Sequence, residues 1–295
     1  MPLKHTRSFR VRFYECDAYG HLNNSNYVRF MQEAAFDASA SAGYDDDSYH
    51  RLNLIWLIRE TEVEYLQPLR YGDTAEVTTW VEDFRRVRSR RVYEIRRQGE
   101  DTLLARGSTD WVLLNQDTLR PVSIPEEMKL AFFPEGAPDK VGKREGFPSP
   151  PPPPIGAVTV TREVAWEDVD PAQHVNNAKY FTYIEEAGIQ AAAQFGFSMQ
   201  EYLDQGLGTV ARKTRIEYKQ PAILGDTLKI TTYLSDPRRI RATRHFALRR
   251  QSDQALIAQA FVLWVFVDLN TGKPVRVPKE LLDGFSEHIS SPEGS

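Results

Sequence analysis

Two stretches of this sequence nearly repeat each other and decide the fold: Cys16-Asp17-Ala18-Tyr19-Gly20-His21-Leu22-Asn23-Asn24 and Val169-Asp170-Pro171-Ala172-Gln173-His174-Val175-Asn176-Asn177. Their offset is 153 residues, and it continues without a gap to further matched pairs: Tyr27 and Tyr180, Glu64-Tyr65 and Glu217-Tyr218, Gly72-Asp73-Thr74 and Gly225-Asp226-Thr227, Trp111 and Trp264. A constant offset of this kind is the mark of a repeated unit. The chain is therefore predicted to hold two copies of one domain.

A stretch rich in proline, glycine and charge separates the two copies. We predict an N-terminal domain over residues 1–133, a linker over 134–156 and a C-terminal domain over 157–295. The linker contains five consecutive prolines, Pro150–Pro154, which favour the extended and stiff polyproline II conformation.

Each copy shows the same order of expected elements. An extended stretch (9–14; 158–166) precedes the repeated loop, and a helix with an apolar stripe follows it, capped by Asn24 or Asn177 and ended near Gly43 or Gly196. Four strand-like stretches come next: residues 54–65, 75–83, 89–97 and 102–114 in the first copy, and 210–218, 227–235, 242–250 and 255–267 in the second. One long helix and an antiparallel sheet form an α+β domain with the helix on one sheet face.

Composition excludes several classes of protein. Of 295 residues 41% are hydrophobic and 26% charged, which is ordinary for a globular chain. The longest apolar run, residues 261–267, is far shorter than the ~20 residues of a membrane helix. Residues 1–12 do not read as a secretory signal, and Cys16 is the only cysteine, so we expect a cytoplasmic protein without disulfides. A net charge of −4 argues against nucleic-acid binding.

The repeated loop, the helix carrying Glu-Ala, and Tyr-x-x-Pro before Gly-Asp-Thr resemble the hotdog-fold thioesterases, namely the 4-hydroxybenzoyl-CoA thioesterase-like and acyl-ACP thioesterase families. The resemblance covers nearly the whole chain outside the linker and tails. It implies two tandem hotdog domains, each a sheet wrapped around its helix, that pair into an intrachain pseudo-dimer with two non-identical clefts. Further association of such chains into a homo-oligomer is compatible with it.

The loop residues carry the chemistry that thioester hydrolysis needs. Asp17 and Asp170 precede the helix, where a carboxylate could attack a thioester carbonyl or activate water, or simply cap backbone N–H groups. His21 and His174 follow four residues later, and histidine accepts protons near neutral pH unless it is held in a structural hydrogen bond. In acyl-ACP thioesterases the residue matching His174 is catalytic, as is an asparagine at the position of Ala172 here.

Other candidates for the clefts rest on the resemblance or on position. In the acyl-ACP family a glutamate matching Glu217 helps to activate water, and Glu64 is its counterpart in the first copy; a surface glutamate on a strand is the alternative. Gly20 allows close backbone approach to the substrate, and Asn23 and Asn176 organise the loop or touch the ligand. Glu33 and Glu186 on the helix, and Cys16, are read as structural.

Arginine is concentrated in two equivalent windows, residues 85–97 and 238–250, which hold 13 of the 27 arginines. Arginine binds phosphate in a bidentate manner, so Arg88 and Arg241 are candidates for holding coenzyme A or the acidic acyl carrier protein. A charged outer sheet face is the alternative.

The sequence thus predicts an acyl thioester hydrolase that releases a carboxylic acid, fatty in type, from acyl-CoA or acyl-ACP. A hotdog hydratase or dehydratase and a non-catalytic acyl-thioester-binding protein remain open alternatives. No phosphate-binding glycine loop and no metal-ligand spacing is present, so neither a cofactor nor a metal is expected.

Overall fold

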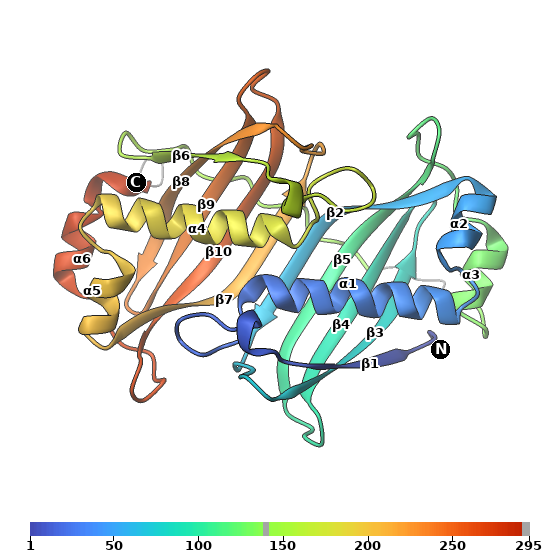
Figure 1. Ribbon diagram of the computed structural model, residues 1–295, viewed down its shortest axis with the longest axis horizontal. Helices are drawn as coiled ribbons and strands as arrows, with labels where there is room; N and C mark the ends of the chain where they lie inside the picture. The colour runs from blue at the N-terminus through green and yellow to red at the C-terminus, as the bar shows by residue number, and fades with distance from the viewer. Residues whose placement is uncertain (138–141, 291–295) are drawn as a thin grey trace. The chain divides into compact units, whose positions relative to one another are not determined.

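The computed structural model describes residues 1–137 and 142–290, which fold into two units, Met1–Gly146 and Phe147–Ser295 (Figure 1). The division lies inside the predicted linker. Each unit is described by itself below, and the expected pairing of the two units stays a prediction.

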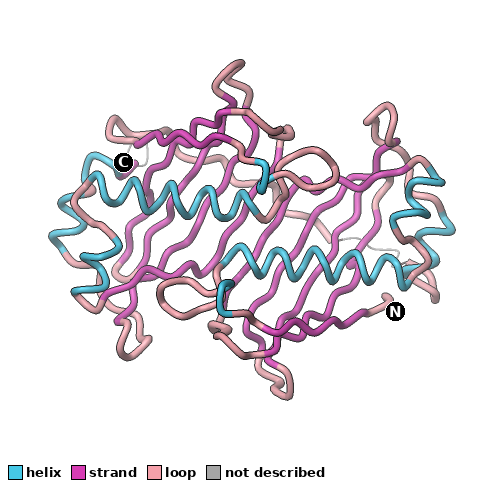
Figure 2. Tube along the Cα trace, in the orientation of Figure 1, coloured by secondary structure: helices cyan, strands magenta, loops and turns pink. Residues whose placement is uncertain are grey.

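The first unit is a five-stranded antiparallel sheet with one long helix on it. The strands lie in the order β1-β3-β4-β5-β2, and helix α1 crosses one face of this sheet (Figure 2). Its elements are β1 (His5–Arg10), the 3₁₀ turn η1 (Phe13–Glu15), α1 (Asn24–Ser41), α2 (Asp46–Leu52), β2 (Leu54–Tyr65), β3 (Thr74–Phe84), β4 (Arg88–Arg97), β5 (Leu103–Asn115) and α3 (Glu126–Phe132).

The second unit repeats this layout. Its strands lie in the order β7-β10-β9-β8, with β6 and β11 both paired to β8, and α4 lies on the sheet (Figure 1). Its elements are β6 (Val158–Glu163), the 3₁₀ turn η2 (Trp166–Asp168), α4 (Lys179–Gln194), α5 (Met199–Asp204), β7 (Leu207–Tyr218), β8 (Thr227–Arg238), β9 (Arg241–Arg250), β10 (Leu256–Asp268), α6 (Lys279–Gly284), the 3₁₀ turn η3 (Ser286–His288) and β11 (Ile289–Ser290).

The apolar stripe of each long helix faces its sheet, as the periodicity predicted. Every member of the two stripes is at most 5% exposed: Tyr27, Phe30, Met31, Ala34 and Ala38 on α1, and Tyr180, Tyr183, Ile184, Ala187 and Ala191 on α4. Aromatic pairs join helix to sheet at the same place in each unit, because the Tyr27 and Tyr65 ring centroids lie 5.2 Å apart and those of Tyr180 and Tyr218 also 5.2 Å. The stripe therefore fixes which helix face meets the sheet.

The structure corrects the prediction at the start of each unit. The first strand spans His5–Arg10 rather than residues 9–14, and Phe13–Glu15 forms a 3₁₀ turn. The turn forms because the Glu15 carboxylate accepts the Arg12 N–H at 2.7 Å, while the Val11 N–H bonds to Asp73. In the second unit β6 likewise ends at Glu163 rather than at 166. The short helices α2, α3, α5 and α6 were not predicted.

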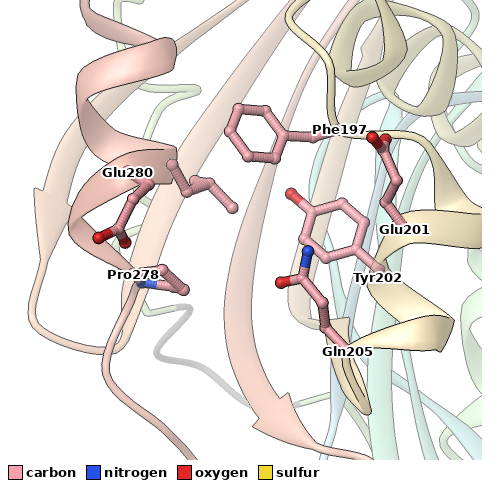
Figure 3. A pocket seen from close by; sticks show the side chains of 7 residues that line it. Phe197, Glu201, Tyr202, Gln205, Pro278 and Glu280 are labelled. Atoms are coloured by element: carbon pink, nitrogen blue, oxygen red, sulfur yellow. The ribbon is translucent and has the colours of Figure 1, made fainter.

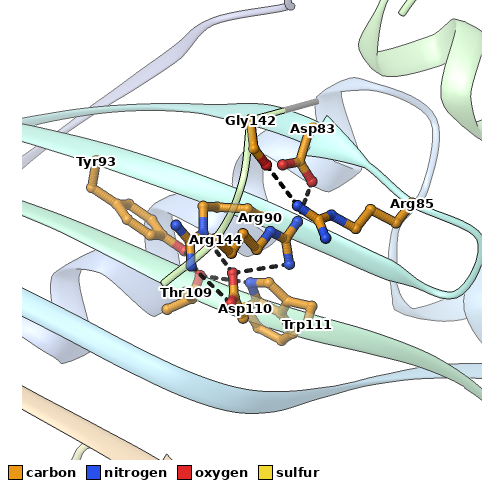
Figure 4. A network of polar contacts seen from close by, with 9 residues as sticks. All are labelled: Asp83, Arg85, Arg90, Tyr93, Thr109, Asp110, Trp111, Gly142 and Arg144. Atoms are coloured by element: carbon orange, nitrogen blue, oxygen red, sulfur yellow. Dashed lines mark hydrogen bonds and ion pairs between the residues drawn. The ribbon is translucent and has the colours of Figure 1, made fainter. Parts of the chain in front are cut away.

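The linker is attached to the first unit by a network of charged side chains (Figure 4). Arg144 contacts the Asp83 carboxylate and lies 3.3 Å from Asp110, which Arg90 holds through two bonds of 2.7 and 2.9 Å. The Arg144 and Asp83 side chains are only 11% and 7% exposed. A buried carboxylate needs such a partner, since an unpaired charge in the interior is strongly destabilising.

The proline run of the linker belongs to the second unit and is held through its carbonyls. Tyr233 donates its hydroxyl hydrogen to the Pro151 carbonyl, and Ser290 donates to the Pro152 carbonyl at 2.8 Å. Proline has no N–H, so these carbonyls are its only backbone hydrogen-bonding groups. Side-chain hydrogen bonds therefore hold the proline run to the second unit, although the run itself is not a strand.

We predict that Arg144→Gln lowers the free energy of unfolding by about 3 kcal/mol, because it leaves the buried Asp83 carboxylate without its cation. Urea unfolding followed by circular dichroism measures this change. Arg88→Gln, which removes an exposed arginine, is the control and should change stability by less than about 0.5 kcal/mol. Equal effects of the two variants would contradict the role given to Arg144.

Candidate active site

In both units the repeated loop is closed by its aspartate. In the first unit one oxygen of Asp17 accepts the N–H groups of Tyr19 at 2.9 Å and His21 at 3.0 Å. In the second unit the corresponding oxygen of Asp170 accepts the Ala172 N–H at 3.0 Å. Backbone bonds between the ends of each loop, from Asp17 N–H to His21 and from Asp170 N–H to His174, complete the turn at 2.8 and 3.0 Å.

These bonds give both aspartates a structural task. A carboxylate that accepts backbone N–H groups stabilises a tight turn, which is the non-catalytic alternative raised by the sequence. The same geometry also fixes the direction of the second carboxylate oxygen. In Asp170 this second oxygen accepts the side-chain amide N–H of Asn176 at 3.2 Å.

In the second unit the histidine approaches the aspartate. Nδ1 of His174 lies 3.8 Å from the Asp170 carboxylate and 3.4 Å from the Val175 carbonyl oxygen. A carbonyl can only accept, so the Nδ1 atom of neutral His174 carries the proton and Nε2 keeps its lone pair. A histidine in this tautomer can act as a base through Nε2.

The histidine of the first unit is placed differently. The His21 ring lies against Tyr19, with 6.4 Å between ring centroids, and among the described residues it makes no ion pair with Asp17. Burial lowers the pKa of His21 below its ordinary value, the nearby Asp17 charge opposes this shift, and the Arg70 guanidinium adds to it. His21 therefore favours the neutral form more than a free histidine does.

The structure corrects both expected helix caps. Asn23, rather than Asn24, caps α1 by accepting the Ser25 N–H at 3.0 Å. In the second unit α4 begins only at Lys179, and its N-cap is Ala178, which has no side-chain cap bond, so the expectation for Asn177 was wrong. The Asn176 side chain accepts the Ala178 N–H at 3.0 Å in the turn that precedes this helix.

Glu64 and Glu217 lie on the sheet face away from the long helix of their own unit. Their neighbours Tyr65 and Tyr218 face the helix; Tyr65 donates to the carbonyl of Asn24, the first residue of α1, at 3.4 Å, and Tyr218 to that of Asn177, two residues before α4, at 3.1 Å. Successive strand residues point to opposite faces. Glu64 accordingly pairs across strands with Arg106 at 2.5 Å, and Glu217 accepts from Gln259 at 2.7 Å and contacts Lys219 at 2.6 Å. Among the described residues of each unit, no hydrogen bond or ion pair joins the glutamate to the loop histidine.

Most side chains of the two arginine windows are either ion-paired or buried. Arg90 pairs with Asp110, Arg96 with Glu94, Arg97 with Asp73 and Glu100, Arg238 with Asp236, and Arg250 with Asp226 and Asp253. Arg91 and Arg244 are buried, at 6% and 5% exposure.

The exposed Arg88 and Arg241 start strands β4 and β9, and the ten-residue strand β4 places Arg88 about 30 Å from Arg97. Since Arg97 pairs with Asp73 near the loop, Arg88 lies far from Asp17 within its own unit.

Two kinds of residue near the loop were missed in the sequence. Glu15 and Asp168 share the 153-residue offset and are 7% and 1% exposed. Asp168 anchors the second loop by accepting from Tyr183 at 2.7 Å, Ala165 at 3.0 Å and Arg162 at 3.2 Å. The offset could have revealed this pair. Arg70, whose backbone bridges His21, is the other residue missed, because its proximity is a consequence of folding.

A pocket in the second unit lies away from the loop. Phe197, Tyr202, Pro278 and Leu281 form its apolar lining, with Gln205 and the carboxylates of Glu201 and Glu280 at its edge (Figure 3). It involves α5 and α6, beyond the C-terminal end of the 16-residue helix α4, whereas the Asp170 loop precedes the N-terminal end. A helix of this length spans about 24 Å, so the pocket is separate from the candidate site.

In the described parts of the chain, no cluster of three or more histidine, cysteine or acidic side chains could bind a metal. Over the same residues, no helix is long and apolar enough to span a membrane.

The fold and the loop are those of the hotdog thioesterases. Residues 2–132 match the family described as Acyl-ACP thioesterase N-terminal domain, and residues 164–285 match the Thioesterase-like superfamily. Each half of the chain therefore matches a thioesterase family, and the resemblance inferred from the loop is confirmed.

The curated relatives that the chain resembles are acyl-ACP thioesterases. The chain is 29% identical over 190 residues to the chloroplastic acyl-[acyl-carrier-protein] hydrolase FATB2 of Cuphea viscosissima, which covers 61% of this chain and 46% of the relative. It is 25% identical over 205 residues to oleoyl-acyl carrier protein thioesterase 1 of Arabidopsis thaliana, covering 63% and 55%. The chain thus spans about half the length of the curated relatives it matches.

Solved structures share the fold along most of the chain. A putative oleoyl thioesterase from Lactobacillus plantarum has a TM-score of 0.73 at 18% identity, covering 90% of this chain and 96% of that one. The 12:0-ACP thioesterase from Umbellularia californica has a TM-score of 0.68 at 20% identity, covering 92% and 97%. At these identities the likeness concerns the fold.

We predict that two charge-neutralising variants shift the pKa of His21 in opposite directions. Asp17→Asn removes the negative charge and should lower this pKa further, whereas Arg70→Gln removes the positive charge and should raise it. Titration of the imidazole signals by nuclear magnetic resonance measures both shifts. Arg120→Gln, an exposed change beyond the far end of β5, should leave the pKa as it is, and a common shift in all three variants would contradict the local origin.

Proposed function

We propose that this protein hydrolyses acyl thioesters of acyl carrier protein or coenzyme A, with the loop of the second unit as the catalytic site. The observation that carries the proposal is the approach of His174 to Asp170, at 3.8 Å, which the first unit lacks among its described residues. The named relatives act on acyl-ACP, and one of them on the oleoyl thioester. We therefore favour a fatty acyl group on acyl carrier protein, and acyl-CoA as the second carrier to test.

In this mechanism Nε2 of His174 removes a proton from water, and the resulting hydroxide attacks the thioester carbonyl. The Asp170 carboxylate stabilises the imidazolium that forms. N–H groups at the start of α4 offer positive potential to the developing oxyanion, as helix N-termini do. The tetrahedral intermediate then breaks its C–S bond, and His174 returns the proton to the thiolate. The products are one carboxylic acid and one thiol.

In this mechanism Asp170 orients His174 and stabilises its protonated form, and it does not itself attack the thioester. One of its oxygens is bonded to the Ala172 N–H at 3.0 Å and the other to Asn176 at 3.2 Å. A carboxylate with both oxygens engaged is a poor nucleophile, whereas it can still stabilise a neighbouring cation. The role is that of a charged partner to His174.

We expect Asp170→Asn to lower kcat about 100-fold or more, which is the usual contribution of acid–base catalysis. Asp17→Asn is a matched control, because it removes the same charge from the corresponding loop of the first unit, and its effect should be far smaller. Both amides can still accept the backbone N–H groups, and thermal melting verifies folding. Equal losses from the two variants would contradict the assignment to the second unit.

Thiol release from a series of acyl-ACP and acyl-CoA substrates, varied in chain length, tests the activity itself. The proposal predicts thiol release that His174→Gln abolishes. Hydration of a 2-enoyl thioester without thiol release would favour the hydratase alternative. Tight binding of acyl thioesters without turnover would favour the non-catalytic alternative.

A further inference from the structure

The pocket between α5 and α6 has an apolar wall that is built from aromatic and aliphatic side chains. Its cavity volume is about 300 Å³, at the lower end of the range for small-molecule sites. Tyr202 and Leu281 in this wall are buried, and the Phe197 and Tyr202 ring centroids lie 6.4 Å apart. Figure 3 shows the Tyr202 ring opposite the side chains of α6, across the pocket. The proposed hydrolysis gives this pocket no task.

The aromatic wall is held in place by packing behind it. Phe197 stacks on Phe285 with ring centroids 5.1 Å apart. Gly284 makes this packing possible, because a Cβ on Gly284 would lie only 2.9 Å from the Phe197 ring. A ring fixed in this way contacts a ligand with little further loss of side-chain entropy, which favours binding.

The charges at this pocket are negative. Glu201 on α5 and Glu280 on α6 lie at its edge, and no lysine or arginine is among the described residues that line it. Hydrogen bonds from Ser198, its backbone N–H first, lower the pKa of Glu201, so this carboxylate stays ionised. Together α5 and α6 carry four acidic residues and one lysine. The electrostatic potential at the pocket therefore favours a cation.

The first unit has the same aromatic pair together with a cation of its own. The Tyr44 and Tyr49 rings, at the positions of the pocket's aromatic pair, lie 5.9 Å apart. On the helix that carries Tyr49, the Arg51 guanidinium donates to the Ser48 hydroxyl at 2.8 Å. The first unit therefore places a guanidinium from its own chain on this helix.

The second unit reverses these charges at the same 153-residue offset. Glu201 stands at the position of Ser48, and Asp204 stands at the position of Arg51. Asp204 accepts from the Gln200 amide at 2.8 Å, which is a neutral partner and leaves its charge unbalanced. Helix α5 contains no basic residue. The second unit thus keeps the aromatic pair and replaces the cation by carboxylates.

We propose that this pocket binds a small organic cation, in which an apolar aromatic or alkyl body carries an ammonium or guanidinium group. The apolar body packs against Phe197, Tyr202 and Leu281, where burial of its surface is favourable. The charged group interacts with the carboxylates of Glu201 and Glu280 and with the faces of the aromatic rings. The assignment is independent of thioester hydrolysis, because the pocket and the Asp170 loop lie at opposite ends of α4.

Three probes of similar size and different charge test this assignment: 2-phenylethylammonium, 2-phenylethanol and 3-phenylpropanoate. Ligand-observed nuclear magnetic resonance titrations with the native protein measure their dissociation constants. The ammonium should bind about fivefold more tightly than the alcohol, because two exposed carboxylates each contribute modestly, and the propanoate should bind most weakly. Higher ionic strength should reduce these differences, since salt screens exposed charges.

Variants of the pocket locate the probe. Glu201→Gln and Glu280→Gln each remove one charge, and the double variant should bind the ammonium and the alcohol equally. Glutamine can still accept the Ser198 N–H, so the start of α5 is kept. Gln205→Trp, an exposed change at the edge of the pocket, should weaken the binding of all three probes by filling the space. The matched control is Glu127→Gln, at the position of Glu280 in the first unit, and it should keep the preference for the ammonium.

Thermal melting verifies that each variant is folded. Equal binding of the three probes by the native protein, or no binding at millimolar concentrations, would overturn the proposal. A preference for the ammonium that survives in the double variant, or that is lost in Glu127→Gln, would place the cation elsewhere on the molecule and contradict the pocket as its site. Undiminished binding to Gln205→Trp would have the same meaning.

Discussion

The hydrogen bonds that backbone N–H groups donate to a loop carboxylate are the constraint on which the candidate site depends. They give Asp17 and Asp170 the same turn, although the residues between aspartate and histidine differ in the two copies. A loop held by its own aspartate tolerates changes at the positions it encloses, because these positions contribute backbone rather than side chains to the turn. The chemistry of each loop is then set by the histidine orientation and by what lies around it.

Much of the fold could be predicted because it follows from periodicity. The helical stripes and the alternating strands depend on local spacing, and the 153-residue offset checks each assignment against a second copy. The first strand was misplaced because apolar and polar side chains alternate over residues 9–14 as well. In the structure the 3₁₀ turn Phe13–Glu15, which the Glu15 carboxylate closes, prevents the strand from continuing there. The cap of α1 at Asn23 was missed by one residue because two consecutive asparagines offer the same signal, whereas α4 begins two residues later in the repeat, after Ala178.

The site was less predictable because it depends on which residues folding brings together. Asp170 and His174 are four residues apart, and their approach is local, so the sequence could suggest it. Glu64 and Glu217 show the opposite case, because the tyrosine after each glutamate turns toward the helix and the alternation of the strand then directs the glutamate away. Which face of the strand each glutamate occupies could in principle be read from this alternation. The approach of the Arg70 side chain to Gly20, fifty positions earlier in the chain, could not.

The repeat within a single chain has a consequence for how such a protein can evolve. When two identical subunits form a hotdog pair, every substitution appears in both loops at once, so a residue that helps one task is imposed on the other. Two copies in one chain mutate separately while staying in equal number. The exchanges of Arg70 for Ile223 and Gly20 for Gln173 are changes of this kind. Covalent linkage thus removes a symmetry, and each loop becomes free to specialise.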